Sequence, residues 1–182
     1  LTHAWDNTII LWDVETGEII HQYLGHDNWL WNIAISPDEK TFISASADST
    51  MILWDIESGE IIRHFLGHED SVLSVDFSPD GKWVVSAGRD GLVTLWNVET
   101  GEWLRHFRGN TNWVRAIDYS PVADVFVTGD SDGSIILWDM QTMDAMIDWA
   151  QQNRYVRELT CEERELFNIE PYCEKSADTD ES

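Results

Sequence analysis

The chain has 182 residues, of which 43% are hydrophobic, so it is long and apolar enough to bury the core of a domain of ordinary size. Its formal net charge of −23 makes a surface that repels phosphate backbones and the anionic inner leaflet, which argues against nucleic-acid and membrane-surface partners. No apolar run approaches the roughly 20 residues that a membrane-spanning helix needs.

Tryptophan recurs at a fixed interval along most of the chain. Trp12, Trp54, Trp96 and Trp138 each stand 42 positions after the one before. Each lies in a similar stretch, which reads IILWDVETGEII at 9–20, MILWDIESGEII at 51–62, VTLWNVETGEWL at 93–104 and, more faintly, IILWDMQTMDAM at 135–146. A constant period of this length indicates repeated supersecondary units.

Each repeat predicts four short strands in chain order. In the repeat at 25–66 the expected strands are WLWNIAIS (29–36), TFISAS (41–46), MILWDI (51–56) and IIRHFL (61–66). They alternate or are rich in β-branched and aromatic residues, and they are separated by the turn sequences PDEK, ADST and ESGE. Four antiparallel strands in about 42 residues is the length of a propeller blade. We therefore expect an all-β fold with a partial blade at 1–24 and blades at 25–66, 67–108 and 109–140.

The Gly-His pairs at 25–26 and 67–68, followed by Trp-Asp at 54–55, resemble the WD-repeat family, and the likeness covers residues 1–140. This resemblance implies a buried, hydrogen-bonded set of polar side chains within each blade. Carried over, the sets are His26, Ser44, Asp48 and Trp54; His68, Ser86, Asp90 and Trp96; and Asn110, Thr128, Asp132 and Trp138. Asn110 departs from the family's histidine, and the first repeat has no residue for that position.

Serine, histidine and aspartate together also invite a hydrolase interpretation. A catalytic triad occurs once per active site, whereas this trio returns with the repeat, which favours a structural network inside each blade. The sequence carries no GxSxG, P-loop, HExxH or paired-cysteine zinc spacing. We predict no catalytic residue, no cofactor and no metal site.

The fourth repeat loses its turn glycine, because Met143 stands in that position. Helical spacing then predicts an α-helical extension at 141–170, and the acidic residues 171–182 predict a disordered tail. The segments LTCEERE and EPYC resemble the end of certain bacterial WD-repeat proteins, which implies a bacterial origin and a natural C-terminus at Ser182. Cys161 and Cys173 predict a reduced thiol pair in the cytoplasm, with a local disulfide as the alternative.

Propellers close with about 4–8 blades, and this chain holds roughly three and a half. We therefore expect a propeller arc that is part of a larger closed ring. Its partners would include missing N-terminal blades or an upstream effector domain of the same chain, such as the NACHT-type ATPase or kinase to which similar propellers are attached.

Function should lie where the repeats differ, because the repeated positions serve the architecture. The resemblance places the start of the first strand and the turn between the second and third strands on one rim, the top face. The variable positions there define the predicted top-face patch: Trp5, Trp29, Trp31, Leu73, Arg89, Trp113 and Arg115. Tryptophan and arginine are enriched in binding hot spots, although extra packing by large residues is the alternative.

The leading hypothesis is a non-catalytic scaffold or sensor module of a larger bacterial signalling protein, which binds a protein or peptide on the top face. The first alternative is a propeller enzyme with a site at the channel mouth. Such an enzyme would need non-repeating acids or histidines to converge there. The second alternative is a purely structural assembly block, for which truncation of the top-face tryptophans would leave function intact.

Overall fold

The computed structural model describes residues 1–3 and 6–140. Within these residues the chain forms strands and no helix. The strands are β1 (Thr2–His3), β2 (Thr8–Trp12), β3 (Ile19–Leu24), β4 (Leu30–Ile35), β5 (Thr41–Ser46), β6 (Thr50–Asp55), β7 (Ile61–Leu66), β8 (Val72–Phe77), β9 (Trp83–Gly88), β10 (Val93–Asn97), β11 (Trp103–Phe107), β12 (Val114–Tyr119), β13 (Val125–Asp130) and β14 (Ile135–Asp139).

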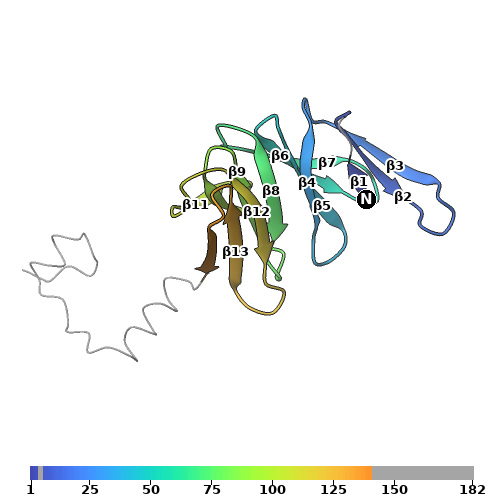
Figure 1. The fold of residues 1–182 in the computed structure, drawn as a ribbon. Coiled ribbons are helices and arrows are strands. Elements are labelled where there is room, and N and C mark those ends of the chain that lie inside the picture. The colour runs from blue at the N-terminus through green and yellow to red at the C-terminus, as the bar shows by residue number, and fades with distance from the viewer. Residues whose placement is uncertain (4–5, 141–182) are drawn as a thin grey trace, which may run out of the picture. The chain divides into compact units, whose positions relative to one another are not determined.

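The strands form four antiparallel sheets in chain order, which Figure 1 shows as successive blades from blue β1–β3 to orange-brown β12–β14. Two sheets are four-stranded, β4-β5-β6-β7 and β8-β9-β10-β11, and two are three-stranded, β1-β2-β3 and β12-β13-β14. The first strands of neighbouring sheets, β4, β8 and β12, contact one another. The predicted all-β blade arrangement is confirmed. The predicted helical extension and acidic tail lie outside the described residues.

The turn sequences place the strands as predicted. The strand expected at 61–66 is β7, and the strand expected at 41–46 is β5. Between β6 and β7 the turn glycine Gly59 has φ of 75°, a left-handed conformation that glycine adopts without a Cβ clash. Its N–H donates to the carbonyl oxygen of Asp55 at 3.1 Å and closes the hairpin.

Three hydrophobic layers lie between the four sheets. Each middle sheet contributes to two of them, because successive side chains of a strand point to opposite faces. In β5, Phe42 belongs to the layer shared with β1–β3, whereas Ile43 belongs to the layer shared with β8–β11. Both side chains are fully buried. The core is therefore built between blades, and each blade depends on its neighbours.

The last sheet exposes one hydrophobic face. On β14, Ile135 is 77% exposed and Leu137 is 70% exposed. The equivalent residues of β10, Val93 and Leu95, are 0% and 8% exposed because β12–β14 covers them. Full burial of an aliphatic side chain contributes about 1.5–3 kcal/mol, so this face leaves a substantial stabilising contribution unused.

Neighbouring blades also meet through a close approach at the turn glycines. A Cβ on Gly59 would lie 1.7 Å from Nε2 of His21, which belongs to the preceding blade. A Cβ on Gly101 would lie 2.5 Å from Cδ of Arg63 in the same relationship. The equivalent Gly17 of the first sheet has nothing within 4 Å among the described residues. The glycine at this turn therefore serves the contact between blades as well as the turn conformation.

Candidate functional site

The structure brings four polar side chains together inside the β4–β7 blade. His26 bridges two of them: its Nδ1 lies 2.7 Å from the Asp48 carboxylate and its Nε2 lies 2.7 Å from Oγ of Ser44. The Trp54 indole donates its Nε1–H to the same Oγ at 2.8 Å. In the next blade His68, Asp90, Ser86 and Trp96 repeat this arrangement with distances of 2.7, 2.6 and 2.7 Å.

These networks determine the charge state of their carboxylates. Burial acts to raise the pKa of Asp48, but the hydrogen bonds from His26 and Thr50 outweigh it and hold that pKa well below its ordinary value. The same balance lowers the pKa of Asp90, where His68 supplies the main hydrogen bond. Both carboxylates are therefore ionised at neutral pH.

The geometry argues against a nucleophilic role for the two serines. Ser44 and Ser86 are fully buried, and each Oγ accepts the indole N–H of the blade's own tryptophan. A nucleophile must reach a substrate, whereas these hydroxyls satisfy buried donors in the blade interior. The arrangement supports the blade and offers no site for acyl transfer.

The β12–β14 blade builds its network with a different carboxylate from the one that we predicted. Asn110 donates through Nδ2 to Asp130 at 3.3 Å and accepts from Oγ1 of Thr128, which also accepts from the Trp138 indole. Asp132 instead accepts from the exposed side chains of Thr111 and Asn112. The prediction of Asp132 as a member of this network is therefore wrong.

The correction has a simple physical reason. Asparagine is shorter than histidine, so the amide of Asn110 bonds a carboxylate at the end of β13 and not the one in the turn beyond it. Burial acts to raise the pKa of Asp130, but bonds from Asn110 and the backbone N–H groups of Ser134 and Asp132 lower it overall. The equivalent positions hold Ser46 and Gly88, so an acid there was a departure from the repeat that sequence reasoning overlooked.

The first sheet keeps only part of the network. The Trp12 indole donates to Oγ1 of Thr2 at 2.8 Å, while Asp6 accepts from the backbone and hydroxyl of Thr8. Trp12 is 37% exposed, whereas Trp54 and Trp96 are each 1% exposed. The first sheet therefore leaves its indole far more accessible than the two middle blades leave theirs.

Arg89 is the centre of the predicted top-face patch. Its guanidinium carbon lies 4.7 Å from the ring centroid of Trp113 and 5.7 Å from that of Trp31. Both distances fall within the range of a cation–π interaction. The two tryptophans come from the blades on either side of the blade that carries Arg89. One arginine therefore joins three blades at their top rim.

A repeated backbone contact explains how Arg89 reaches this position. Its N–H donates to the carbonyl oxygen of Ser71 at 2.9 Å, and the equivalent pairs are Ala47 with Trp29 and Ser131 with Trp113. The contact ties the turn after the second strand to the start of the first strand in every complete repeat. The flanking blades carry tryptophan beside this contact, whereas the middle blade carries the small Ser71.

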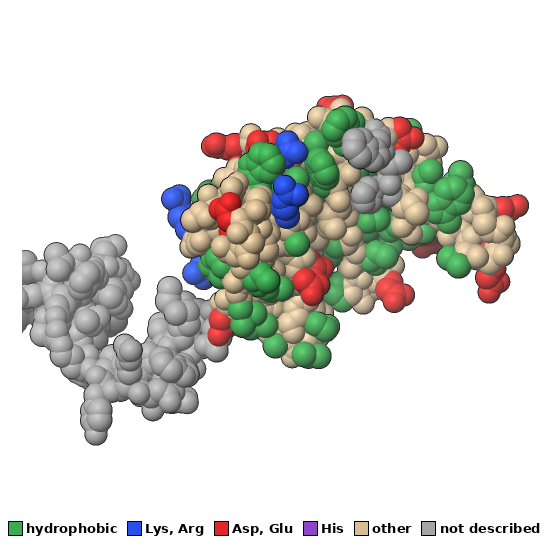
Figure 2. All heavy atoms as spheres, viewed as in Figure 1, with side chains coloured by type: hydrophobic (Ala, Val, Ile, Leu, Met, Phe, Trp, Pro, Cys, Tyr) green, Lys and Arg blue, Asp and Glu red, His purple; other side chains and the backbone are tan. Residues whose placement is uncertain are grey.

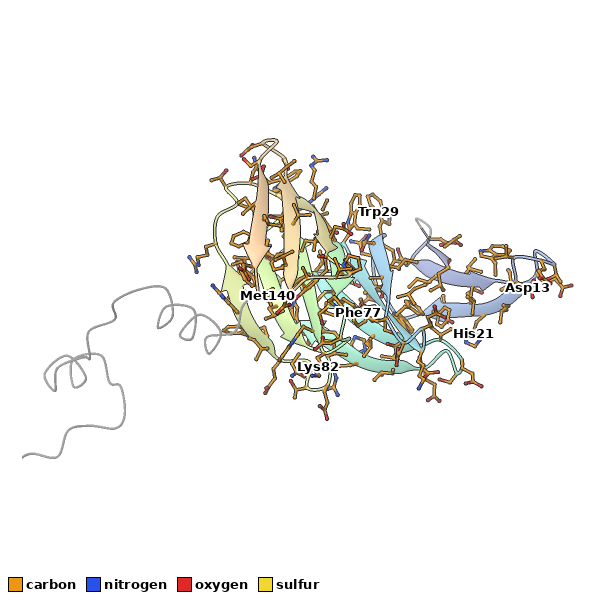
Figure 3. All side chains as sticks on the ribbon, turned by 90° about the horizontal axis from the view of Figure 1, so that it is seen from below. Asp13, His21, Trp29, Phe77, Lys82 and Met140 are labelled. Carbon is orange, nitrogen blue, oxygen red and sulfur yellow. The ribbon has the colours of Figure 1, made fainter. Side chains whose placement is uncertain are left out.

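The other members of the top-face patch lie at the same rim. Trp29, Trp31 and Trp113 are 46%, 36% and 41% exposed, and Leu73 is half-buried. Nε of the exposed Arg115 donates to Oγ of Ser131 at 3.2 Å. In Figure 3, Trp29 and Lys82 lie at opposite edges of the blades. Trp5 lies outside the described residues.

Two acidic side chains of the innermost strands bear on the enzyme alternative. Asp76 on β8 accepts the backbone N–H of Tyr119 on β12 at 2.7 Å and that of Phe77 at 2.9 Å. Burial raises the pKa of Asp76, and the negative charge of Asp118 adds to the effect. Because the Asp76 carboxylate already joins two blades through backbone groups, we interpret it as structural.

The structure also bears on metal binding and on membrane spanning. Among residues 1–3 and 6–140, no cluster of three or more histidine, cysteine or acidic side chains has the arrangement to hold a metal ion. Over the same residues, no helix has the length and apolar character to cross a membrane.

Comparison with known proteins gives a consistent result. The family described as "WD domain, G-beta repeat" matches residues 17–55, 59–97 and 101–139. A solved structure titled "Structure of U3-55K" superposes with a TM-score of 0.72 at 28% identity, over 76% of this chain and 44% of that chain. The similarity thus extends over nearly all of the described residues.

Curated relatives share shorter stretches. Guanine nucleotide-binding protein subunit beta-1 of Caenorhabditis briggsae is 39% identical over 46 residues, which is 25% of this chain and 14% of that protein. The Lissencephaly-1 homolog of Heterostelium pallidum is 42% identical over 43 residues, or 24% and 10%. Human WD repeat-containing protein 37 is 37% identical over 46 residues, or 25% and 9%. The matched stretches therefore span a small part of these relatives.

Proposed function

Because the chain belongs to the WD-repeat family, we propose that it is a non-catalytic interaction module that binds a protein or peptide through its top-face patch. Propellers of this family generally mediate protein–protein interactions. The observation that carries the proposal is the convergence of Trp31, Arg89 and Trp113 from three blades at one rim. None of the three is required by the repeat, because at least one equivalent position holds another residue type: Leu73 for Trp31, Ala47 for Arg89 and Ser71 for Trp113.

The composition of the patch supports binding rather than packing alone. Three tryptophans remain more than a third exposed at the rim, although an indole is among the costliest side chains to leave in water. Tryptophan and arginine together are the residue types that dominate the energetics of protein interfaces. In Figure 2, basic side chains lie among hydrophobic ones on the upper part of the face shown, on an otherwise acidic chain.

The proposal also covers the domains against which the module packs. The hydrophobic face of β14 is suited to packing against a further blade, as β10 packs against the last sheet. We include missing blades or an upstream effector domain among the partners for this reason. The proposed bacterial origin rests on the resemblance of the C-terminal sequence, and the proposed signalling role rests on the effector domains to which similar propellers are attached. The proposed cytoplasmic location rests on Cys161 and Cys173 as a reduced thiol pair. The alternatives are a propeller enzyme and a purely structural assembly block.

A peptide selection tests the proposed function. The full 182-residue chain would be used to select binders from a random linear peptide library, and the dissociation constants of the selected peptides would be measured by fluorescence anisotropy. The triple substitution Trp29→Ala, Trp31→Ala, Trp113→Ala should weaken binding about 30-fold or more, which corresponds to hot-spot residues. Trp103→Ala is the matched control, because this indole is 54% exposed on β11, away from the rim.

Two results would contradict the proposal. One is a library that yields no specific binder. The other is equal loss of binding in the triple variant and in Trp103→Ala, provided that both variants keep the thermal midpoint of the parent chain.

A further inference from the structure

We infer that the partner presents an acidic side chain to the top-face patch, and that the guanidinium of Arg89, which lies against the rings of Trp31 and Trp113, binds its carboxylate. This inference rests on the proposed function and specifies the chemistry of the partner. It follows from three observations. The guanidinium of Arg89 already covers the aromatic surface, its donors have no acceptor among the described residues, and the positively charged Arg115 lies at the same rim.

The space between the two indole rings is already occupied by a cation of the chain itself. The Arg89 guanidinium lies 4.7 Å from the centroid of Trp113 and 5.7 Å from that of Trp31. Two aromatic rings around one position otherwise suit a cationic ligand such as an ammonium group. A cationic partner would have to displace Arg89 and would then meet the positive charge of Arg115. The patch is therefore built against cationic partners.

The guanidinium of Arg89 makes no hydrogen bond to the described residues. Its Nε is buried and has no hydrogen-bond partner, and among the described residues the guanidinium makes no ion pair. A guanidinium offers five N–H donors and no acceptor, and its planar fork matches a carboxylate. A ligand carboxylate would therefore pair with guanidinium donors for which the described residues supply no acceptor.

The rings also hold the side chain in place before a ligand arrives. A free arginine side chain loses much rotamer freedom when it is immobilised, whereas one held between two rings has lost it already. Arg115 lies at the same rim, with its Nε held by Ser131. Two oriented cations beside exposed indoles would recognise a segment in which acidic and apolar residues alternate.

The net charge of the chain determines which experiment can test this recognition. A body with a net charge of −23 repels an acidic partner at long range, while Arg89 attracts it at contact. Added salt screens both effects, so the salt dependence of binding does not isolate the contact. Replacing the acidic residues of the peptide with neutral ones does isolate the contact.

The experiment uses the peptides selected by the full chain. Each would be resynthesised with Asn for Asp and Gln for Glu, and its affinity would be compared with that of the parent peptide. We expect the parent peptides to be enriched in acidic residues and the neutral versions to bind about tenfold more weakly or worse. Arg89→Gln should cause the same loss for the parent peptide and little further loss for the neutral one.

A matched control comes from a second arginine stacked on a ring. Arg105 lies on the exposed strand β11, at the opposite edge of its sheet from β8, with its guanidinium carbon 4.7 Å from the ring centroid of Phe107. Arg105→Gln should leave the affinity of every peptide unchanged. Arg89→Lys should recover only part of the affinity, because an ammonium keeps the charge and lacks the planar fork.

The outcomes separate this inference from the proposed function. Peptides that need the top-face tryptophans but bind equally well in their neutral form would overturn the inference and leave the proposed function standing. A library without binders would overturn both. A single-stranded oligonucleotide that binds more tightly than every peptide, and loses its affinity in Arg89→Gln, would replace the acidic peptide by a nucleic acid and overturn the inference.

Discussion

The guanidinium of Arg89 stacks on the indole of Trp113, with 4.7 Å between its central carbon and the ring centroid. The two residues stand 24 positions apart in the sequence and belong to neighbouring blades. We expect a double-mutant cycle with Arg89→Ala and Trp113→Ala to give a favourable coupling of about 0.5–1 kcal/mol, the range for partly exposed cation–π pairs. The free energies of unfolding would come from urea titrations. The pair Arg89→Ala and Trp103→Ala should show no coupling, and coupling there would contradict a specific contact.

Removal of one hydroxyl should weaken the β4–β7 blade. Ser44→Ala deprives both the buried Trp54 Nε1–H and the His26 ring of their common partner. Leaving a buried donor without a partner costs about 1–3 kcal/mol, so the unfolding midpoint in urea should fall accordingly. Ser58→Ala, in the exposed turn after β6, removes only the bonds that the hydroxyl makes with Asp55 and with the backbone N–H of Glu60, and it should cost less. Equal losses would show that the network does not stabilise the blade.

Gly25 should tolerate no side chain. A Cβ at this position would lie 2.8 Å from Cη2 of the buried Trp54 and 3.0 Å from Cδ1 of Ile61. Gly25→Ala should therefore destabilise the chain by about 1–3 kcal/mol, the usual cost of overpacking. Gly129→Ala is the matched control, because no atom of the described residues lies within 4 Å of a Cβ there. Thermal melts of the two variants would decide, and a stable Gly25→Ala would mean that Trp54 can move aside.

Stability should fall in acid through Asp48. Burial acts to raise its folded pKa, but the hydrogen bonds from His26 and Thr50 hold that pKa below the ordinary value of an aspartate, so the folded state binds the proton more weakly than the unfolded state. The stabilisation is complete above the unfolded pKa and is lost as the pH falls through the folded one. Asp48→Asn should therefore reduce the decline in the unfolding midpoint below about pH 4. An unchanged decline would exclude Asp48 as a contributor.

The effect of Asp76 on stability in acid should be opposite to that of Asp48. Its folded pKa is raised, so the folded state binds the proton more tightly and gains stability as the pH falls through that pKa. Asp76→Asn removes this gain, and the decline of the midpoint in acid should become steeper. The same urea titrations across pH would measure it, and a shallower decline would contradict the burial of this carboxylate.

The corrected network in the last blade makes a further comparison possible. Asp130 bonds Asn110 and two backbone N–H groups, whereas Asp132 bonds the exposed Thr111 and Asn112. Asp130→Ala should therefore lower the thermal midpoint more than Asp132→Ala does. A greater loss for Asp132→Ala would restore the network that the repeat pattern predicted.

The sequence by itself determined the blade. The 42-residue period, the alternation within TFISAS and the turn glycine at 59 place each strand of the repeat at 25–66 within a residue or two of its observed limits. This succeeds because strand alternation and turn conformation depend on neighbours in the chain. The pairing of His26 with Ser44 and Asp48 could also be predicted from the sequence, because the same spacing returns at His68, Ser86 and Asp90.

Only the tertiary structure decided the contacts that differ from one blade to the next. The repeat pattern pointed to Asp132, but side-chain length selected Asp130 as the partner of Asn110. The sequence assigned Arg89, Trp31 and Trp113 to one patch, but it did not predict that Arg89 lies against the two tryptophans. That arrangement depends on how far three sheets turn relative to one another, and this rotation is set by packing between blades, which no local pattern records.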